Sequence, residues 1–184
     1  MSRLRNWWRV LPRPTAAVMT VRTVVFVTGT AAILLAVPAG YRLDGRVMAV
    51  AGAVAGIAAL VPRTAWVDVV EYSAVAVWVG ATVVEQVPVE VPALFGIAVM
   101  LYLHHTFAAM AAALPVNAEV LPQVLTNWAW RAGAVLVVSG VAGIGVLLLP
   151  RLVQPVSSPI APLVALAAAS LIGVTLAFQL RRRG

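Results

Sequence analysis

The sequence has no cysteine and no lysine, and only 10% of its 184 residues are charged. The absence of cysteine excludes disulfides, iron–sulfur clusters, thiolate metal sites and cysteine nucleophiles. In a soluble domain about a quarter of the residues are usually charged, so this chain has too few charges for a surface that faces water. A soluble enzyme, a disordered linker and a free nucleic-acid-binding module are therefore excluded.

Residues that carry catalysis are also scarce. The chain has two histidines, three tyrosines and six carboxylates. It contains no Walker A loop, no His-Glu-x-x-His motif, no Gly-x-Ser-x-Gly nucleophile turn and no dinucleotide-binding fingerprint. We expect no enzymatic activity, and we predict no cofactor and no metal site.

Apolar residues make up 62% of the chain and form six segments separated by charges and prolines. A helix that crosses a hydrocarbon core of ~30 Å needs about 20 residues. The pattern predicts an all-α polytopic membrane protein, a bundle of about six transmembrane helices with short loops. The predicted transmembrane domain, 23–180, contains spans at 23–41, 47–62, 65–84, 93–114, 132–149 and 163–180.

Two shorter stretches have the amphipathic pattern of helices that lie in the membrane interface. One belongs to the N-terminal segment, 1–22, where apolar residues and arginines alternate. The other follows Asn117 and extends to Trp130. Residues 181–184 are predicted to form a basic cytoplasmic tail.

The net charge of +7 comes from thirteen arginines that are distributed unevenly along the chain. If the N-terminus is cytoplasmic, ten arginines lie on the cytoplasmic side and three outside, which satisfies the positive-inside rule. The sequence thus predicts both termini in the cytoplasm, and arginines that meet anionic lipid rather than nucleic acid. The lysine-free, Ala/Val/Arg-rich composition resembles that of GC-rich bacteria, so we expect the bacterial inner membrane. Predicted interface anchors are Trp7, Trp8, Trp66, Trp128, Trp130, Arg181, Arg182 and Arg183.

His104 and His105 lie near the middle of the fourth predicted span, where an ionisable side chain is costly and indicates a functional site. Adjacent helical residues point about 100° apart, so the two histidines face different neighbours. Tyr102 and small residues share the face of His105, so His105 is predicted to be buried and His104 less so. Three roles stay open: a structural hydrogen bond, a proton relay or ligand contact, and a haem or metal ligand.

Asp68, Glu71 and Tyr72 lie at the start of the third span with i, i+3, i+4 spacing, which places them on one helical face. The structural interpretation pairs a carboxylate with Arg63 or Arg131. The functional interpretation places the carboxylates in a proton path with a histidine one to two turns deeper.

Small residues recur at four-residue spacing in three spans, a pattern that lets membrane helices approach closely. These positions predict helix packing within the chain or against a partner. They are Gly52, Gly56, Ser139, Gly143, Ala169, Gly173 and Ala177.

The run from Leu103-His104 to Ala111-Ala112-Ala113, followed by Pro115, Asn117-Ala118-Glu119-Val120 and Trp128, covers about residues 95–131. By this run the chain resembles a group of uncharacterised small integral membrane proteins of actinobacteria, some of them encoded beside MoxR-type AAA+ ATPases. The resemblance implies membership in a membrane assembly.

Three functional hypotheses follow. The first is a non-enzymatic integral membrane subunit or scaffold of a larger complex, in contact with lipid and with other subunits or further copies of itself. A cytoplasmic partner would meet its Trp/Arg-rich inner face. The second is a small oligomeric transporter or channel with His105, Glu71 and Asp68 in a proton or substrate path. The third is a membrane haem or quinone protein that uses His104 or His105.

Overall fold

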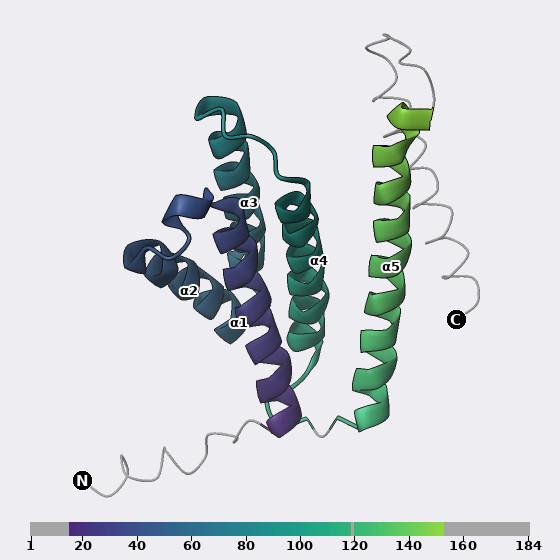
Figure 1. The fold of residues 1–184 in the computed structure, drawn as a ribbon. Helices are drawn as coiled ribbons and strands as arrows, with labels where there is room; N and C mark the ends of the chain where they lie inside the picture. The colour runs from purple at the N-terminus through teal and green to yellow at the C-terminus, as the bar shows by residue number, and fades with distance from the viewer. Residues whose placement is uncertain (1–14, 119, 153–184) are drawn as a thin grey trace, which may run out of the picture. The chain divides into compact units, whose positions relative to one another are not determined.

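The structure, a computed structural model, describes residues 15–118 and 120–152. All regular secondary structure in these ranges is helical, which confirms the all-α prediction (Figure 1). A 3-10 turn, η2 (Ala39–Tyr41), and a π-helical turn, η3 (Gly80–Val84), accompany five α-helices. The helices are α1 (Ala16–Ala36), α2 (Gly45–Leu60), α3 (Trp66–Val79), α4 (Val91–Ala113) and α5 (Pro122–Leu152).

Four of these helical segments are long and apolar enough to cross a membrane, so the chain is a multi-pass membrane protein in contact with lipid. They are Ala16–Ala36, Trp66–Val84, Val91–Ala113 and Pro122–Gly145. Helix α2 is apolar but has only 16 residues. The described residues thus provide four long candidate spans rather than six, and the predicted span 163–180 lies outside them.

The first span differs from its prediction at both ends. The Thr15 hydroxyl accepts a hydrogen bond from the Val18 amide at 3.4 Å and caps the helix, which therefore begins at Ala16 and includes Arg22. The helix stops at Ala36 because Val37 precedes a proline, which disfavours helical geometry. Arg42 then donates from Nε to the Val37 carbonyl at 2.9 Å.

The predicted interfacial helix after Asn117 and the predicted fifth span are one continuous helix, α5. Pro122 is its first residue, a position where the missing amide hydrogen costs nothing. No residue between Trp128 and Ala132 breaks a helix, so the amphipathic segment that begins at Pro122 continues as a helix into the apolar segment after Arg131. The prediction of two separate elements is wrong.

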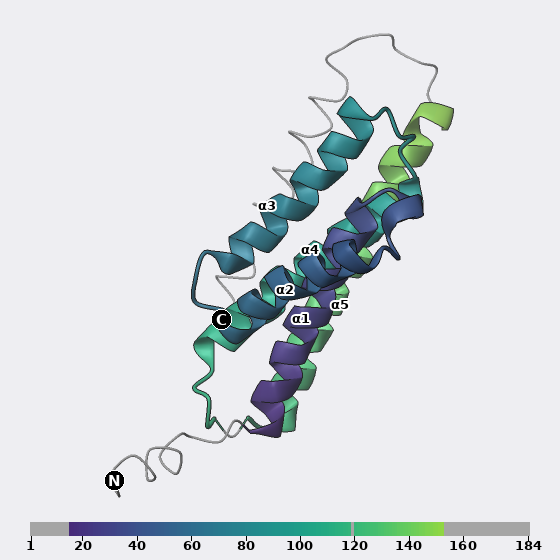
Figure 2. The same ribbon diagram turned by 90° about the vertical axis from the view of Figure 1, so that its left-hand side faces the viewer.

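The chain divides into two compact units, 1–134 and 135–184, so α1 to α4 are described by themselves. These helices run alternately up and down, with α1 and α4 side by side (Figures 1 and 2). Helix α1 makes its most extensive contact with α4 and also packs on α2 and α3. Its buried face is a stripe along the whole helix, formed by Val18, Val21, Val25, Thr28, Gly29, Ala32, Ile33 and Ala36.

Within the described residues the GxxxG motif of α2 is not closely packed against the neighbouring helices, and its packing against a partner stays a prediction. A Cβ built on Gly52 would meet nothing within 4 Å, and one on Gly56 would lie 3.9 Å from the Phe26 ring, an ordinary contact. The buried side chains of α2 are alanines on another face, at 51, 55, 58 and 59. Gly143 lies in the second unit with Ser139, which is exposed, and Ala169, Gly173 and Ala177 lie outside the described residues.

Three of the predicted interface tryptophans lie within the described residues. Trp66 is the first residue of α3 and is 38% exposed, and Trp130 is 78% exposed. Trp128 differs, because it packs against the core and its buried Nε1 has no hydrogen-bond partner in the described chain. Trp7, Trp8 and the arginines at 181–183 lie outside the described residues.

Candidate functional site

His104 is fully buried between α4 and α1. Its Nδ1 lies 3.0 Å from the Val25 carbonyl oxygen, and because a carbonyl only accepts, this ring nitrogen carries the hydrogen and donates it. Gly29 makes room for the ring. A Cβ at that position would lie only 2.8 Å from His104 Nδ1 and Cε1.

The prediction that His105 is the buried histidine is therefore wrong, since His104 is 0% exposed and the His105 side chain is 67% exposed. His105 was predicted to be buried because small residues share its face of the same helix. The room for the buried ring comes instead from the neighbouring helices, where Gly29 of α1 lies close to Ala55 of α2.

The side chains of His105 on α4 and Glu71 on α3 form a hydrogen-bonded pair, with Nδ1 2.9 Å from Oε1. The Glu71 side chain is 26% exposed, so the pair lies on the outward face of these two helices. The structure thus brings together two residues of the predicted proton path. Among the described residues neither carboxylate of α3 pairs with an arginine, because Arg63 donates from Nε to the Ala112 carbonyl instead.

The pair lies inside two candidate membrane spans rather than at their ends. Glu71 is five residues into α3, and His105 is eight residues before the end of α4. At 1.5 Å per residue these offsets are about 8 and 12 Å, or one to two turns. Both positions belong to the same end of the bundle, since α3 begins where α4 ends.

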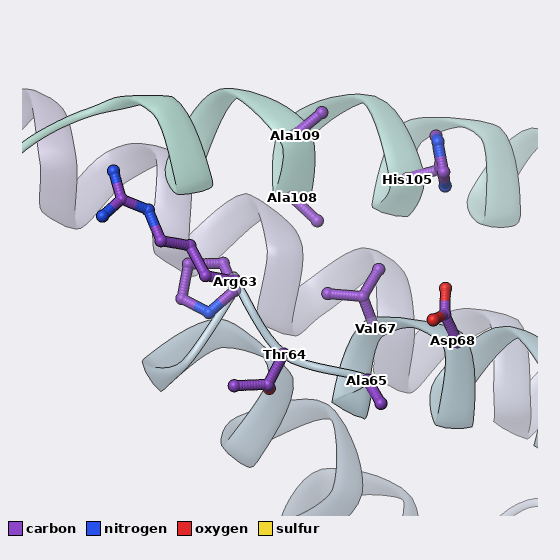
Figure 3. Close-up of a pocket in the computed structure, with 9 residues that line it drawn as sticks. Arg63, Thr64, Ala65, Val67, Asp68, His105, Ala108 and Ala109 are labelled. Carbon is purple, nitrogen blue, oxygen red and sulfur yellow. The ribbon is translucent and has the colours of Figure 1, made fainter.

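An open depression of about 420 Å³ lies at this end of the bundle, and His105 is one of the residues that line it (Figure 3). Asp68 on α3 and His105 on α4 line it from facing helices, and Arg63 lies in the connection between α2 and α3. Tyr72 is 74% exposed and lines no part of the depression, and neither does the half-buried Tyr102. The described residues contain no cluster of three metal-binding side chains.

A second depression, of about 280 Å³, lies at the same end and shares Arg63 with the first. Its other basic residue is Arg22, one of the ten arginines that the positive-inside rule assigns to the cytoplasmic side. Sequence reasoning missed this pair of arginines, because they are far apart in the chain and meet only where α1 begins and α2 ends. Gly29 was missed for the same reason.

The site therefore combines a hydrogen-bonded carboxylate–imidazole pair with a second carboxylate and two arginines at one end of a helical bundle. Comparisons of the chain with protein-family models, with curated proteins and with solved structures find no match.

Proposed function

We propose that the chain is a non-enzymatic integral membrane subunit, or scaffold, of a larger complex in the bacterial inner membrane. It crosses the membrane several times, with both termini in the cytoplasm. The observation that carries the proposal is the outward-facing His105–Glu71 pair. The resemblance to small actinobacterial membrane proteins, some of them encoded beside MoxR-type AAA+ ATPases, agrees with it.

The exposed pair supports a partner subunit because polar side chains that face lipid are energetically unfavourable. An ionisable side chain in a membrane span almost always faces the bundle interior or a water-filled cavity, and it pairs with another such group or with a backbone carbonyl. His105 has one partner, Glu71, and most of its ring is open in the described chain. A neighbouring subunit that covers this face would hydrogen-bond the exposed ring nitrogen and shield the carboxylate from lipid.

Site-specific crosslinking in living cells tests the proposal. A photoreactive residue replaces Ala109, which is exposed one turn beyond His105, and in a control strain it replaces Val50, which is 64% exposed on α2. We expect position 109, but not position 50, to form an adduct with a second membrane polypeptide, and His105→Leu to reduce it at least tenfold. Adducts with lipid alone at position 109 would contradict the subunit proposal.

The first depression favours a second candidate function, proton transfer through the membrane. Arg63, Asp68 and His105 line this open depression, so water that enters it reaches His105, the partner of Glu71. Proteoliposomes with an internal pH dye separate the two candidates. Proton flux that is lost in both His105→Leu and Glu71→Gln would support a transporter, and flux at the level of empty liposomes would reject it. The described residues give the haem or quinone hypothesis no comparable support.

A further inference from the structure

We infer that the phosphate group of an anionic phospholipid binds between Arg22 and Arg63, in the second depression. The depression, of about 280 Å³, lies at the end of the bundle where α1 begins, α2 ends and α4 ends. Two of the ten described residues that line it are arginines, and none is acidic. The depression therefore has a net positive charge that no described lining residue neutralises.

Arg22 is the strongest indication of a ligand. Its Nε is buried and has no hydrogen-bond partner in the part of the chain that the structure describes. A guanidinium group stays protonated in proteins, and a buried donor on a charged group is costly when it stays unpaired. A phosphate oxygen would satisfy this donor, because the guanidinium fork matches phosphate in a bidentate geometry.

Arg63 lines the same depression from the connection between α2 and α3. Its Nε donates to the Ala112 carbonyl near the end of α4, which fixes the position of the guanidinium. The same arginine lines both depressions. Arg22 and Arg63 thus line one depression from two elements.

The rest of the lining favours a lipid over a small soluble anion. Leu60, Val61, Leu114 and Val116 surround the arginines with apolar surface, and Leu60 is 68% exposed. Basic pockets between membrane helices, close to their ends, bind anionic lipid headgroups. A phosphodiester at the arginines would place its acyl chains along these apolar residues.

Native mass spectrometry of the full chain tests the inference, with phosphatidylglycerol and phosphatidylcholine added at equal concentration. We expect the wild-type protein to retain one phosphatidylglycerol at least tenfold more than phosphatidylcholine. Arg22→Gln should weaken this retention about tenfold, since a charge-assisted hydrogen bond carries about that factor or more. The control is Arg46→Gln, an exposed arginine at the start of α2 that lines neither depression, and it should retain the lipid as the wild type does.

A second variant at position 22 and a competition with inorganic phosphate complete the experiment. Arg22→Lys preserves the charge but loses the planar fork, so its retention should fall between those of the wild type and Arg22→Gln. Inorganic phosphate, added in excess, should displace little of the bound lipid, because it has no acyl chains. Equal retention of the two lipids by the wild type would overturn the inference even if every variant misfolds. If inorganic phosphate displaced most of the bound phosphatidylglycerol, the ligand would be a small anion and not a lipid.

Discussion

At the scale of single residues, the close approach of Gly29 to His104 makes a sharp prediction. Gly29→Ala places a methyl group 2.8 Å from two ring atoms and 3.2 Å from Ala55 Cβ. The ring is buried and hydrogen-bonded to Val25, so it has no free space to move into. We expect a loss of about 1–3 kcal/mol in the free energy of unfolding from overpacking, measured by thermal or denaturant unfolding of the purified protein in detergent.

Gly52→Ala is the matched control, because it makes the same chemical change inside a helix where nothing lies within 4 Å of the new methyl group. Replacing a helical glycine by alanine is favourable by up to about 1 kcal/mol, so this variant should unfold at or above the wild-type temperature. Equal effects of the two substitutions would show that His104 does not fill the space beside Gly29.

The two histidines also show where sequence reasoning reaches its limit. Helical spacing correctly places His104 and His105 on different faces, and the cost of an ionisable group in a span correctly marks them as unusual. Which face is buried depends on the neighbouring helix. Val25 and Gly29 precede His104 by more than seventy residues, and no local pattern reports that they meet it.

At the scale of elements, the alanine face of α2 predicts how that helix packs. Ala55 is 0% exposed, whereas Ala53 on the same helix is exposed. Ala55→Leu should overfill the contact with α1 and destabilise the bundle by about 1–3 kcal/mol. Ala53→Leu should leave the unfolding temperature within error of the wild type. If Ala53→Leu were the more harmful variant, the assigned face of α2 would be wrong.

Element boundaries were predictable where charges and prolines mark them. Helices α2, α3 and α4 begin and end within a few residues of their predictions, since Arg46, Arg63 and Pro92 stand at their ends. Helix α1 begins earlier because a threonine cap is invisible to hydropathy. Helix α5 joins two predicted segments because a change from polar to apolar composition does not interrupt a helix.

At the scale of the whole molecule, the proposed orientation makes a prediction that the cysteine-free sequence renders simple to test. Single cysteines introduced at Leu43, between α1 and α2, and at Thr64, between α2 and α3, lie at opposite ends of α2. With both termini in the cytoplasm, a membrane-impermeant maleimide should label position 43 in intact cells. It should label position 64 only after the membrane is permeabilised. The reverse pattern would invert the proposed topology.

Of the candidate site, the sequence indicated the residue types but not their arrangement. Glu71 and His105 were placed in one hypothetical path, and the structure brings them to 2.9 Å. The predicted pairing of a carboxylate of α3 with Arg63 is wrong, because Arg63 donates a hydrogen bond to a backbone carbonyl at the end of α4 instead. Both outcomes depend on how α3 and α4 are placed, which spacing within one helix does not determine.

The contact between Gly29 and His104 also constrains how this protein can evolve. A larger residue at position 29 destabilises the protein while the imidazole is present at 104, and the loss of that ring leaves a cavity that a larger residue at 29 can refill. Each single change passes through a less stable intermediate. We therefore expect substitutions at positions 29 and 104 to occur together in evolution, although seventy-four residues separate the two positions in the chain.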